Sequence, residues 1–337
     1  MTGVQTCALP IWILPELNDQ EPLWADFSYS TDIDSVPSGA TVWRQKPDAP
    51  ADEWQLLGTT PLTKVRFASL AGYRVRFELE GHQTLTMLQE ALMGPDMPRG
   101  FNALNPAILE PLGQATEGMV RLPGFTRDLV EYAPYYMGRF EVTNREYAKF
   151  IAAGGYESPR YWTEPFIRDD QEVTFEDAMA LFTDRTGRPG PASWEGGAWP
   201  SGQGEYPVNG ISWYEAVAYA NFTGDMLPTV AHHLSALRLY NINSGTIGMR
   251  SNFSMGGPRA VGEGRALSTF GLYDNVGNVR EWCWNAMADG NRCSFGTSWA
   301  DIPYMANNVS PKSPWDRSLE HGMRLARSSD KIGRAHV

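Results

Sequence analysis

The run from Asp274 to Glu281 carries the strongest chemical signal in the sequence. Both ends of this run are carboxylates, and Gly277 between them permits a turn in which backbone carbonyls point inward with the acidic side chains. Hard oxygen ligands at this density suit Ca²⁺ rather than a transition metal. The alternative is purely structural: a tight turn in which Asp274 caps the backbone while Glu281 is solvated.

Two further groups of residues have side chains that could bind metal. Cys283 and Cys293 could be small buried hydrophobic residues, a disulfide across a hairpin, or a redox or copper pair. His232 and His233 are adjacent, and adjacent residues on a helix point in different directions. Their spacing therefore favours a helix-surface or packing role over a metal site.

The composition narrows the class of protein. The 337 residues carry a net charge of -11, which excludes nucleic acid as the expected partner because phosphate binding needs clustered Lys and Arg. No apolar run approaches the roughly 18 residues of a transmembrane helix, so no membrane segment is expected. Aromatic residues make up 12% of the chain, which indicates folded domains with real cores rather than disorder.

Three helices are predicted in the second part of the chain, which has an α+β pattern. Capping boxes at 143–146 and 212–215 each open a helix, and Gly224 stands past the end of the second. A third helix is predicted over 174–182. The Trp- and Gly-rich loop 194–199 could line a peptide or glycan groove, or its Trp side chains could belong to the core.

The first part of the chain predicts a small all-β sandwich. Apolar residues from Tyr73 to Leu79 alternate with charged ones, the period-two pattern of a half-buried strand. The turn at 37–40, the turn at 58–62 and the 72–82 segment together resemble the PEGA repeat, a non-catalytic extracytoplasmic module. We therefore predict a PEGA-like domain over residues 12–92 and a linker over 93–118.

Both ends of the chain look foreign. The tail 332–337 can be encoded by DNA whose reverse complement, in another frame, encodes residues 6–11. Protein selection has no reason to produce such a relation, whereas a sequencing adapter does. Residues 1–11 and 332–337 are therefore expected to contribute nothing to the fold.

Residues 119–331 resemble the formylglycine-generating-enzyme, or sulfatase-modifying-factor, family. The blocks that carry the resemblance are Tyr136–Asn144, Pro207–Trp213, Leu227–Thr229, Gly271–Trp282, Gly296–Trp299 and His321–Arg324. The resemblance implies an α+β, C-type-lectin-like fold with little regular structure. It also implies structural Ca²⁺ held by the side chains of Asp274 and Glu281 and the carbonyls of Gly277 and Val279. Asn252 and Phe253 resemble the first two ligands of the family's second calcium site.

The chain departs from the enzymatic members where their chemistry takes place. Those members have two cysteines that bind copper and oxidise a substrate cysteine, and here these positions hold Asp301 and Ala306. A carboxylate and a methyl group cannot replace a soft thiolate pair. Catalysis by that route is therefore not expected. The alternative is a metal-dependent oxidoreductase, of formylglycine-generating or non-heme iron type, acting on a thiol substrate.

The arrangement of the two parts resembles the C-terminal sensor region of some bacterial membrane-anchored Ser/Thr protein kinases. This resemblance implies a non-catalytic binding or sensory module with a peptide, protein or glycan ligand. It also implies an upstream kinase domain in the full gene. If the module is attached to such a kinase, the expected compartment is extracytoplasmic or periplasmic.

Overall fold

The computed structural model describes residues 28–46, 49–68, 72–90, 106–114, 116–237, 250–305 and 308–329. The predicted foreign ends and residues 93–105 of the predicted linker lie outside these ranges. The chain divides into two compact units, Met1–Glu117 with Thr269–Gly271, and Gly118–Ser268 with Leu272–Val337. Among the described residues, no helix has the length and hydropathy needed to cross a membrane.

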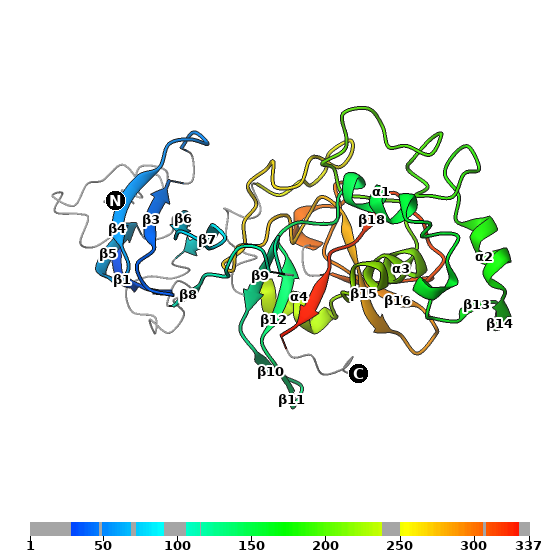
Figure 1. The fold of residues 1–337 in the computed structure, drawn as a ribbon, viewed down its shortest axis with the longest axis horizontal. Helices are drawn as coiled ribbons and strands as arrows, with labels where there is room; N and C mark the ends of the chain where they lie inside the picture. The colour runs from blue at the N-terminus through cyan, green and yellow to red at the C-terminus, as the bar shows by residue number, and fades with distance from the viewer. Residues whose placement is uncertain are drawn as a thin grey trace, which may run out of the picture. The chain divides into compact units, whose positions relative to one another are not determined.

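The first unit is built from β-strands (Figure 1). Its antiparallel four-stranded sheet has the order β4 (Gln55–Thr59), β3 (Thr41–Gln45), β6 (Gly72–Glu78), β7 (Leu85–Glu90). β1 (Ser28–Ile33) pairs with β5 (Leu62–Ala68), and β2 (Ser35–Val36) runs parallel to β8 (Ala107–Ile108). The predicted alternation is confirmed, since Tyr73, Val75 and Phe77 of β6 are buried.

Within its described residues, the second unit contains two sheets and two hairpins. One sheet has the order β19 (Ala326–Ser328), β12 (Tyr135–Gly138), β9 (Met119–Leu122). The other has the order β17 (Val309–Lys312), β16 (Arg292–Phe295), β15 (Arg280–Ala286), β18 (His321–Gly322), with β15 and β18 parallel. The hairpins are β10 (Phe125–Arg127) with β11 (Val130–Tyr132), and β13 (Phe166–Arg168) with β14 (Gln171–Val173).

The described part of the second unit also contains the α-helices α1 (Asn144–Ala152), α2 (Phe175–Leu181), α3 (Trp213–Thr223) and α4 (Val230–Leu237). Short 3₁₀ turns cover Pro159–Tyr161 and Pro303–Met305. Both predicted capping boxes are present. The Thr143 side chain accepts a hydrogen bond from the Glu146 backbone N–H, and the Glu146 side chain accepts one from the Thr143 backbone N–H. Ser212 and Glu215 are joined in the same way. The prediction of a mixed α+β fold is confirmed.

Tryptophan side chains fill the core of the second unit. Trp194, Trp213 and Trp282 are buried, and each indole N–H donates a hydrogen bond to a protein oxygen. Trp194 donates to the Asn144 side chain at 2.8 Å, which ties its loop to the start of α1. Of the two roles considered for the 194–199 loop, Trp194 therefore has the core role and does not line a groove.

Candidate functional site

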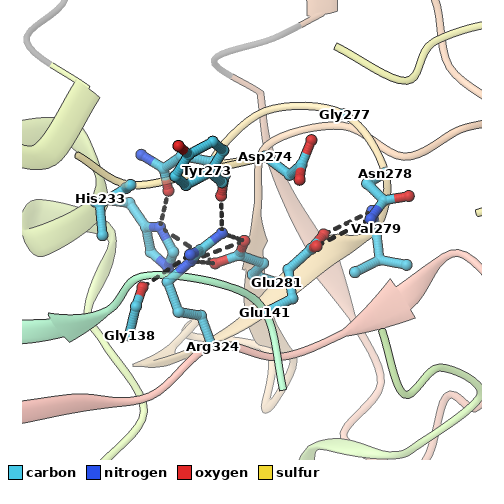
Figure 2. Close-up of polar contacts among 12 residues, drawn as sticks. Gly138, Glu141, His233, Tyr273, Asp274, Gly277, Asn278, Val279, Glu281 and Arg324 are labelled. Atoms are coloured by element: carbon cyan, nitrogen blue, oxygen red, sulfur yellow. Dashed lines mark hydrogen bonds and ion pairs between the residues drawn. The ribbon is translucent and has the colours of Figure 1, made fainter. Parts of the chain in front are cut away.

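The turn that carries Asp274 and Glu281 leads directly into β15, an inner strand of the four-stranded sheet (Figure 2). Asp274, Gly277 and Asn278 have φ angles of 51°, 84° and 62°. A Cβ on Gly277 would lie 3.0 Å from the Asn252 nitrogen, so glycine is needed both for conformation and for space. Asp274 and Glu281 are 1% and 2% exposed, and the alternative of a solvated Glu281 is therefore wrong.

Arg324 is the cation of this site (Figure 2). Its Nε lies 3.1 and 3.0 Å from the two carboxylate oxygens of Glu281, and its Nη2 lies 2.8 Å from Oε1. The remaining guanidinium donors bind the carbonyls of Gly138 and Tyr273 at 2.8 and 2.7 Å. The guanidinium is therefore held from β12, from the turn and from β15 together.

Glu141 is a third buried carboxylate that the residue-level prediction missed. It accepts from the Asn278 side chain at 2.9 Å and from the Val279 N–H at 3.3 Å, so it holds the later part of the turn in place. Figure 2 shows it between the turn and Arg324. Its sequence signal was its place in the 136–144 block, since no spacing relates it to Asp274.

Among the described residues, the site holds more carboxyl groups than guanidinium groups. Burial raises the pKa of Glu141 well above its usual value, and the neighbouring charges of Asp274 and Glu281 raise it further. Burial also raises the pKa of Asp274 and of Glu281, although hydrogen bonds and Arg324 oppose this. Besides Arg324, the guanidinium of Arg259 contacts the site, since its Nη2 lies 3.4 Å from Asp274 Oδ1.

The carboxyl groups and the backbone carbonyls of the turn are hard oxygen ligands, the chemistry that suits Ca²⁺. No group of three or more His, Cys, Asp or Glu that could hold a metal occurs in the described part of the chain. Side chains alone therefore do not form a cage, and the carbonyls of Gly277 and Val279 would have to complete it. The Gly262 N–H donates to Asp274 Oδ2 at 2.6 Å, so a bound cation would compete with this hydrogen bond for the carboxylate.

Asn252, one of the two residues of the predicted second calcium site, is hydrogen-bonded to this same turn. Asn252 donates from its side chain to Asn278 Oδ1 at 3.0 Å and accepts from the Asn278 N–H through its carbonyl at 3.1 Å. Its amide also donates to the Gly257 carbonyl. Phe253, the next residue along the chain, is buried. The hydrogen bonds of Asn252 thus brace the first site.

The histidine pair packs inside the unit, so the packing role holds and the surface role does not. His232 lies edge-on to Tyr135, and burial lowers its pKa to about 4. His233 stacks on Phe295, and its Nδ1 lies 3.8 Å from Glu281 Oε2. Burial and then Arg324 lower its pKa to about 3. Both rings are therefore neutral near pH 7.

Cys283 and Cys293 are buried free thiols on the paired strands β15 and β16. The disulfide considered from sequence is not formed. Burial raises the pKa of both thiols, that of Cys283 well above its usual value. A thiol with a raised pKa is a poor nucleophile and metal ligand, so the two side chains act as small hydrophobic residues.

Asp301 occupies the first position at which enzymatic relatives were expected to have cysteine. Its carboxylate accepts from the backbone and the hydroxyl of Ser298, both at 2.7 Å, and pairs with Arg280 at 2.6 Å. Burial would raise its pKa, but these hydrogen bonds and Arg280 lower it below its usual value. Ala306, the second position, lies outside the described residues.

Comparison with known proteins identifies the second unit. Residues 105–329, well over half of the chain, match the Sulfatase-modifying factor enzyme 1-like domain (FGE-sulfatase). The chain belongs to this family. The match does not reach strands β1 to β7 of the first unit, so the PEGA-like assignment stays a prediction.

Relatives of this sulfatase-modifying-factor domain differ in what surrounds it. The chain is 28% identical over 156 residues to the Ser/Thr-protein kinase pkn1 of Chlamydia pneumoniae, covering 44% of this chain and 22% of the kinase. It is 26% identical over 256 residues to the formylglycine-generating enzyme of Thermomonospora curvata, covering 60% and 79%. It is 28% identical over 261 residues to the inactive C-alpha-formylglycine-generating enzyme 2 of Bos taurus, covering 66% and 79%. The match spans only about a fifth of the kinase.

Proposed function

We propose that this member of the sulfatase-modifying-factor family is a non-catalytic binding or sensory module. The observation that carries the proposal is Asp301, which stands where copper chemistry would need a thiolate. Its carboxylate is fully engaged by Ser298 and Arg280, so it is part of the loop structure rather than an open metal position. Cys283 and Cys293 are buried thiols with raised pKa values, so they are protonated at neutral pH.

Calcium has a structural role in this proposal. Asp274 and Glu281 would supply side-chain oxygens, and Gly277 and Val279 would supply carbonyls. The three buried carboxyl groups support this assignment, because a divalent cation would stabilise their ionised forms against the effect of burial. When bound, the ion would fix the entry to β15, while Arg324 and Glu141 orient the turn.

The wider architecture is also part of the proposal. The second unit would have a C-type-lectin-like arrangement, and the first would be a PEGA-like β-sandwich. The similarity to pkn1 supports a place in a larger bacterial signalling protein such as a Ser/Thr kinase. Attached to a membrane-anchored kinase, the module would be extracytoplasmic or periplasmic and would bind a peptide, protein or glycan.

The test is a direct assay for the chemistry that the proposal excludes. A Cys-x-Pro-x-Arg peptide is incubated with the full chain, copper and oxygen and followed by mass spectrometry. A catalytic family relative serves as the positive control. We expect no conversion of cysteine to aldehyde, and copper and iron contents well below one atom per chain after purification from metal-replete medium. Turnover, or stoichiometric copper or iron, would instead favour the oxidoreductase alternative.

A further inference from the structure

A hollow of about 760 Å³ lies in the second unit, and no residue of the 274–281 turn lines it. Its walls come from the β13–β14 hairpin, the end of α2, the turn between β15 and β16, and residues 313–317 (elements labelled in Figure 1). Volumes of this size hold small ligands or a few residues of a peptide. The hollow therefore has room for a ligand of the kind that a binding module needs.

One wall is apolar and partly accessible. Ile167 and Leu181 are each 43% exposed where they line the hollow. Trp315 also lines the hollow and packs against the core, with its ring centroid 5.4 Å from that of Phe182 and 4.9 Å from that of Tyr214. Its indole N–H donates to the Ile167 carbonyl, which fixes the ring in place. A rigid aromatic surface flanked by exposed aliphatic side chains suits an apolar side chain of a ligand.

Three arginines line the hollow: Arg168 is exposed, whereas Arg292 and Arg317 are half-buried and differ in their partners. Arg317 is neutralised by Glu215 at 2.9 Å, and its other donors bind the carbonyls of Leu181, Thr183 and Gly190. Arg292 lies over the Trp213 ring, with 3.7 Å from its Cζ to the ring centroid, and donates from Nη1 to the Trp284 carbonyl. No ion pair joins Arg292 to another residue in the described part of the chain, although the charge of Glu164, which also lines the hollow, raises the pKa of its guanidinium against the effect of burial. Arg292 is therefore a positioned cation that can accept an anionic partner.

The rim restricts what that partner can be. The lining carries four carboxylates, those of Glu164, Asp169, Asp170 and Asp289, and the exposed guanidinium of Arg168. None of the four carboxylates forms an ion pair with a described residue, so acidic groups predominate at the rim. An anionic polymer would meet these charges as well as Arg292 and would be repelled. A ligand that carries one carboxylate on an apolar body, with a cationic group nearby, is complementary to all three features. A short stretch of peptide has this chemistry.

We propose that this hollow binds a peptide carboxylate at Arg292, with an adjacent apolar side chain against Ile167, Leu181 and Trp315 and a basic residue at the acidic rim. This inference rests on the proposed binding function and names the class of ligand. The carboxylate could be a chain terminus or an acidic side chain, since either matches the bidentate geometry of a guanidinium.

The experiment is calorimetric titration of the full chain with two matched pairs of probes. The first pair is Lys-Ala-Phe with a free carboxyl terminus against its C-terminal amide. The second is acetyl-Lys-Phe-Asp amide against acetyl-Lys-Phe-Asn amide. We expect saturable binding of at least one carboxylate probe and at least tenfold weaker binding of its neutral counterpart. The pair that shows this difference identifies the source of the carboxylate.

Three variants test the assignment. Arg292→Gln should weaken the carboxylate probe at least tenfold and leave the neutral probe unchanged. Ile167→Asp, at an exposed position, should weaken both probes and keeps the test available if the Arg292 variant fails to fold. Arg160→Gln is the matched control, because Arg160 also lies over an aromatic ring but does not line the hollow.

Either of two results overturns the inference: no saturable binding of a carboxylate probe at about 1 mM, or equal affinity of the wild type and Arg292→Gln. Turnover in the thiol-peptide assay would sink the proposed function while leaving this binding measurement intact. The failure of one is thus distinguishable from the failure of the other.

Discussion

Arg324 donates three hydrogen bonds to the carboxylate of Glu281, the shortest between Nη2 and Oε1 at 2.8 Å, and both side chains are almost completely buried. The pair joins the start of β15 to the segment between β18 and β19. Removing one partner of a buried pair leaves the other charge uncompensated, which costs more than the pair itself contributes. Any cation that binds Glu281 must therefore share its carboxylate with Arg324.

The calcium proposal predicts that Ca²⁺ raises the thermal stability of the wild type and that Glu281→Gln abolishes this increment. At about a hundredfold excess of free Ca²⁺ over Kd, binding adds about 2.7 kcal/mol to the free energy of unfolding. The variant will also be less stable without calcium because Arg324 loses its partner. The measurement is therefore the difference in melting temperature between calcium and chelator for each protein, rather than the melting temperature itself.

Glu205→Gln is the control for that experiment. Glu205 is 59% exposed and pairs with Arg145 on the surface, so its loss should leave the calcium increment intact. Asp274→Asn supplies a second ligand variant if Glu281→Gln does not fold. A wild-type protein that melts identically with calcium and with chelator would contradict the proposal.

Local signals in the sequence predicted the elements well because their causes are local. The two capping boxes and the alternation in β6 are each set by residues a few positions apart, and all were found as predicted. The site was only partly predictable. The turn from Asp274 to Glu281 is local, but Glu141 and Arg324 come from strands or loops far away along the chain.

Burial was the other quantity that local patterns did not give. The His232–His233 spacing was compatible with a surface position, yet both rings are enclosed, His232 by Tyr135 and His233 by Phe295. The cysteines likewise allowed three roles, and only the enclosure of β15 and β16 decides between them. Such enclosure depends on which distant segments pack over an element, which no short motif records.

Gly277→Ala should destabilise the protein more than Gly187→Ala, because at Gly187 only the backbone conformation, and not the available space, disfavours a side chain. Gly277 has a φ of 84°, and an added Cβ would lie 3.0 and 3.1 Å from backbone atoms of Asn252. Gly187 has a φ of 82° but has no atom within 4 Å of the same position. Backbone strain of about 1–2 kcal/mol applies to both variants. We expect Gly277→Ala to cost at least about 1 kcal/mol more in denaturant unfolding because of the added overlap; equal costs would show that the turn yields easily.

The buried network at Glu215 predicts a large effect for Arg317→Met. Glu215 is fully buried and accepts from Arg317, from Tyr156 and from the Ser212 N–H. Loss of the guanidinium leaves this carboxylate unpaired and should lower the free energy of unfolding by about 3–5 kcal/mol. Arg145→Met removes an exposed partner instead and should change it by less than about 1 kcal/mol. Equal effects of the two variants, measured by urea denaturation, would refute this assignment.

The buried histidines predict that stability falls as the solution becomes acidic. Burial lowers the pKa of His321 to about 4, although Asp316, 3.6 Å away, opposes the shift, and Lys312 and Arg280 reinforce it. Burial and then His233 lower the pKa of His232 to about 4 as well. Between about pH 6.5 and pH 4 the unfolded chain binds protons at these positions and the folded chain does not. Each histidine therefore lowers the free energy of unfolding by up to about 3 kcal/mol as the pH falls through that window, and has no such effect above it.

His321→Gln and His232→Gln should each reduce the slope of the unfolding free energy against pH in that window by nearly one proton. Denaturant titrations at several values between pH 7 and pH 4 measure the slope, and variants that keep the wild-type slope would show that neither ring resists protonation in the folded state.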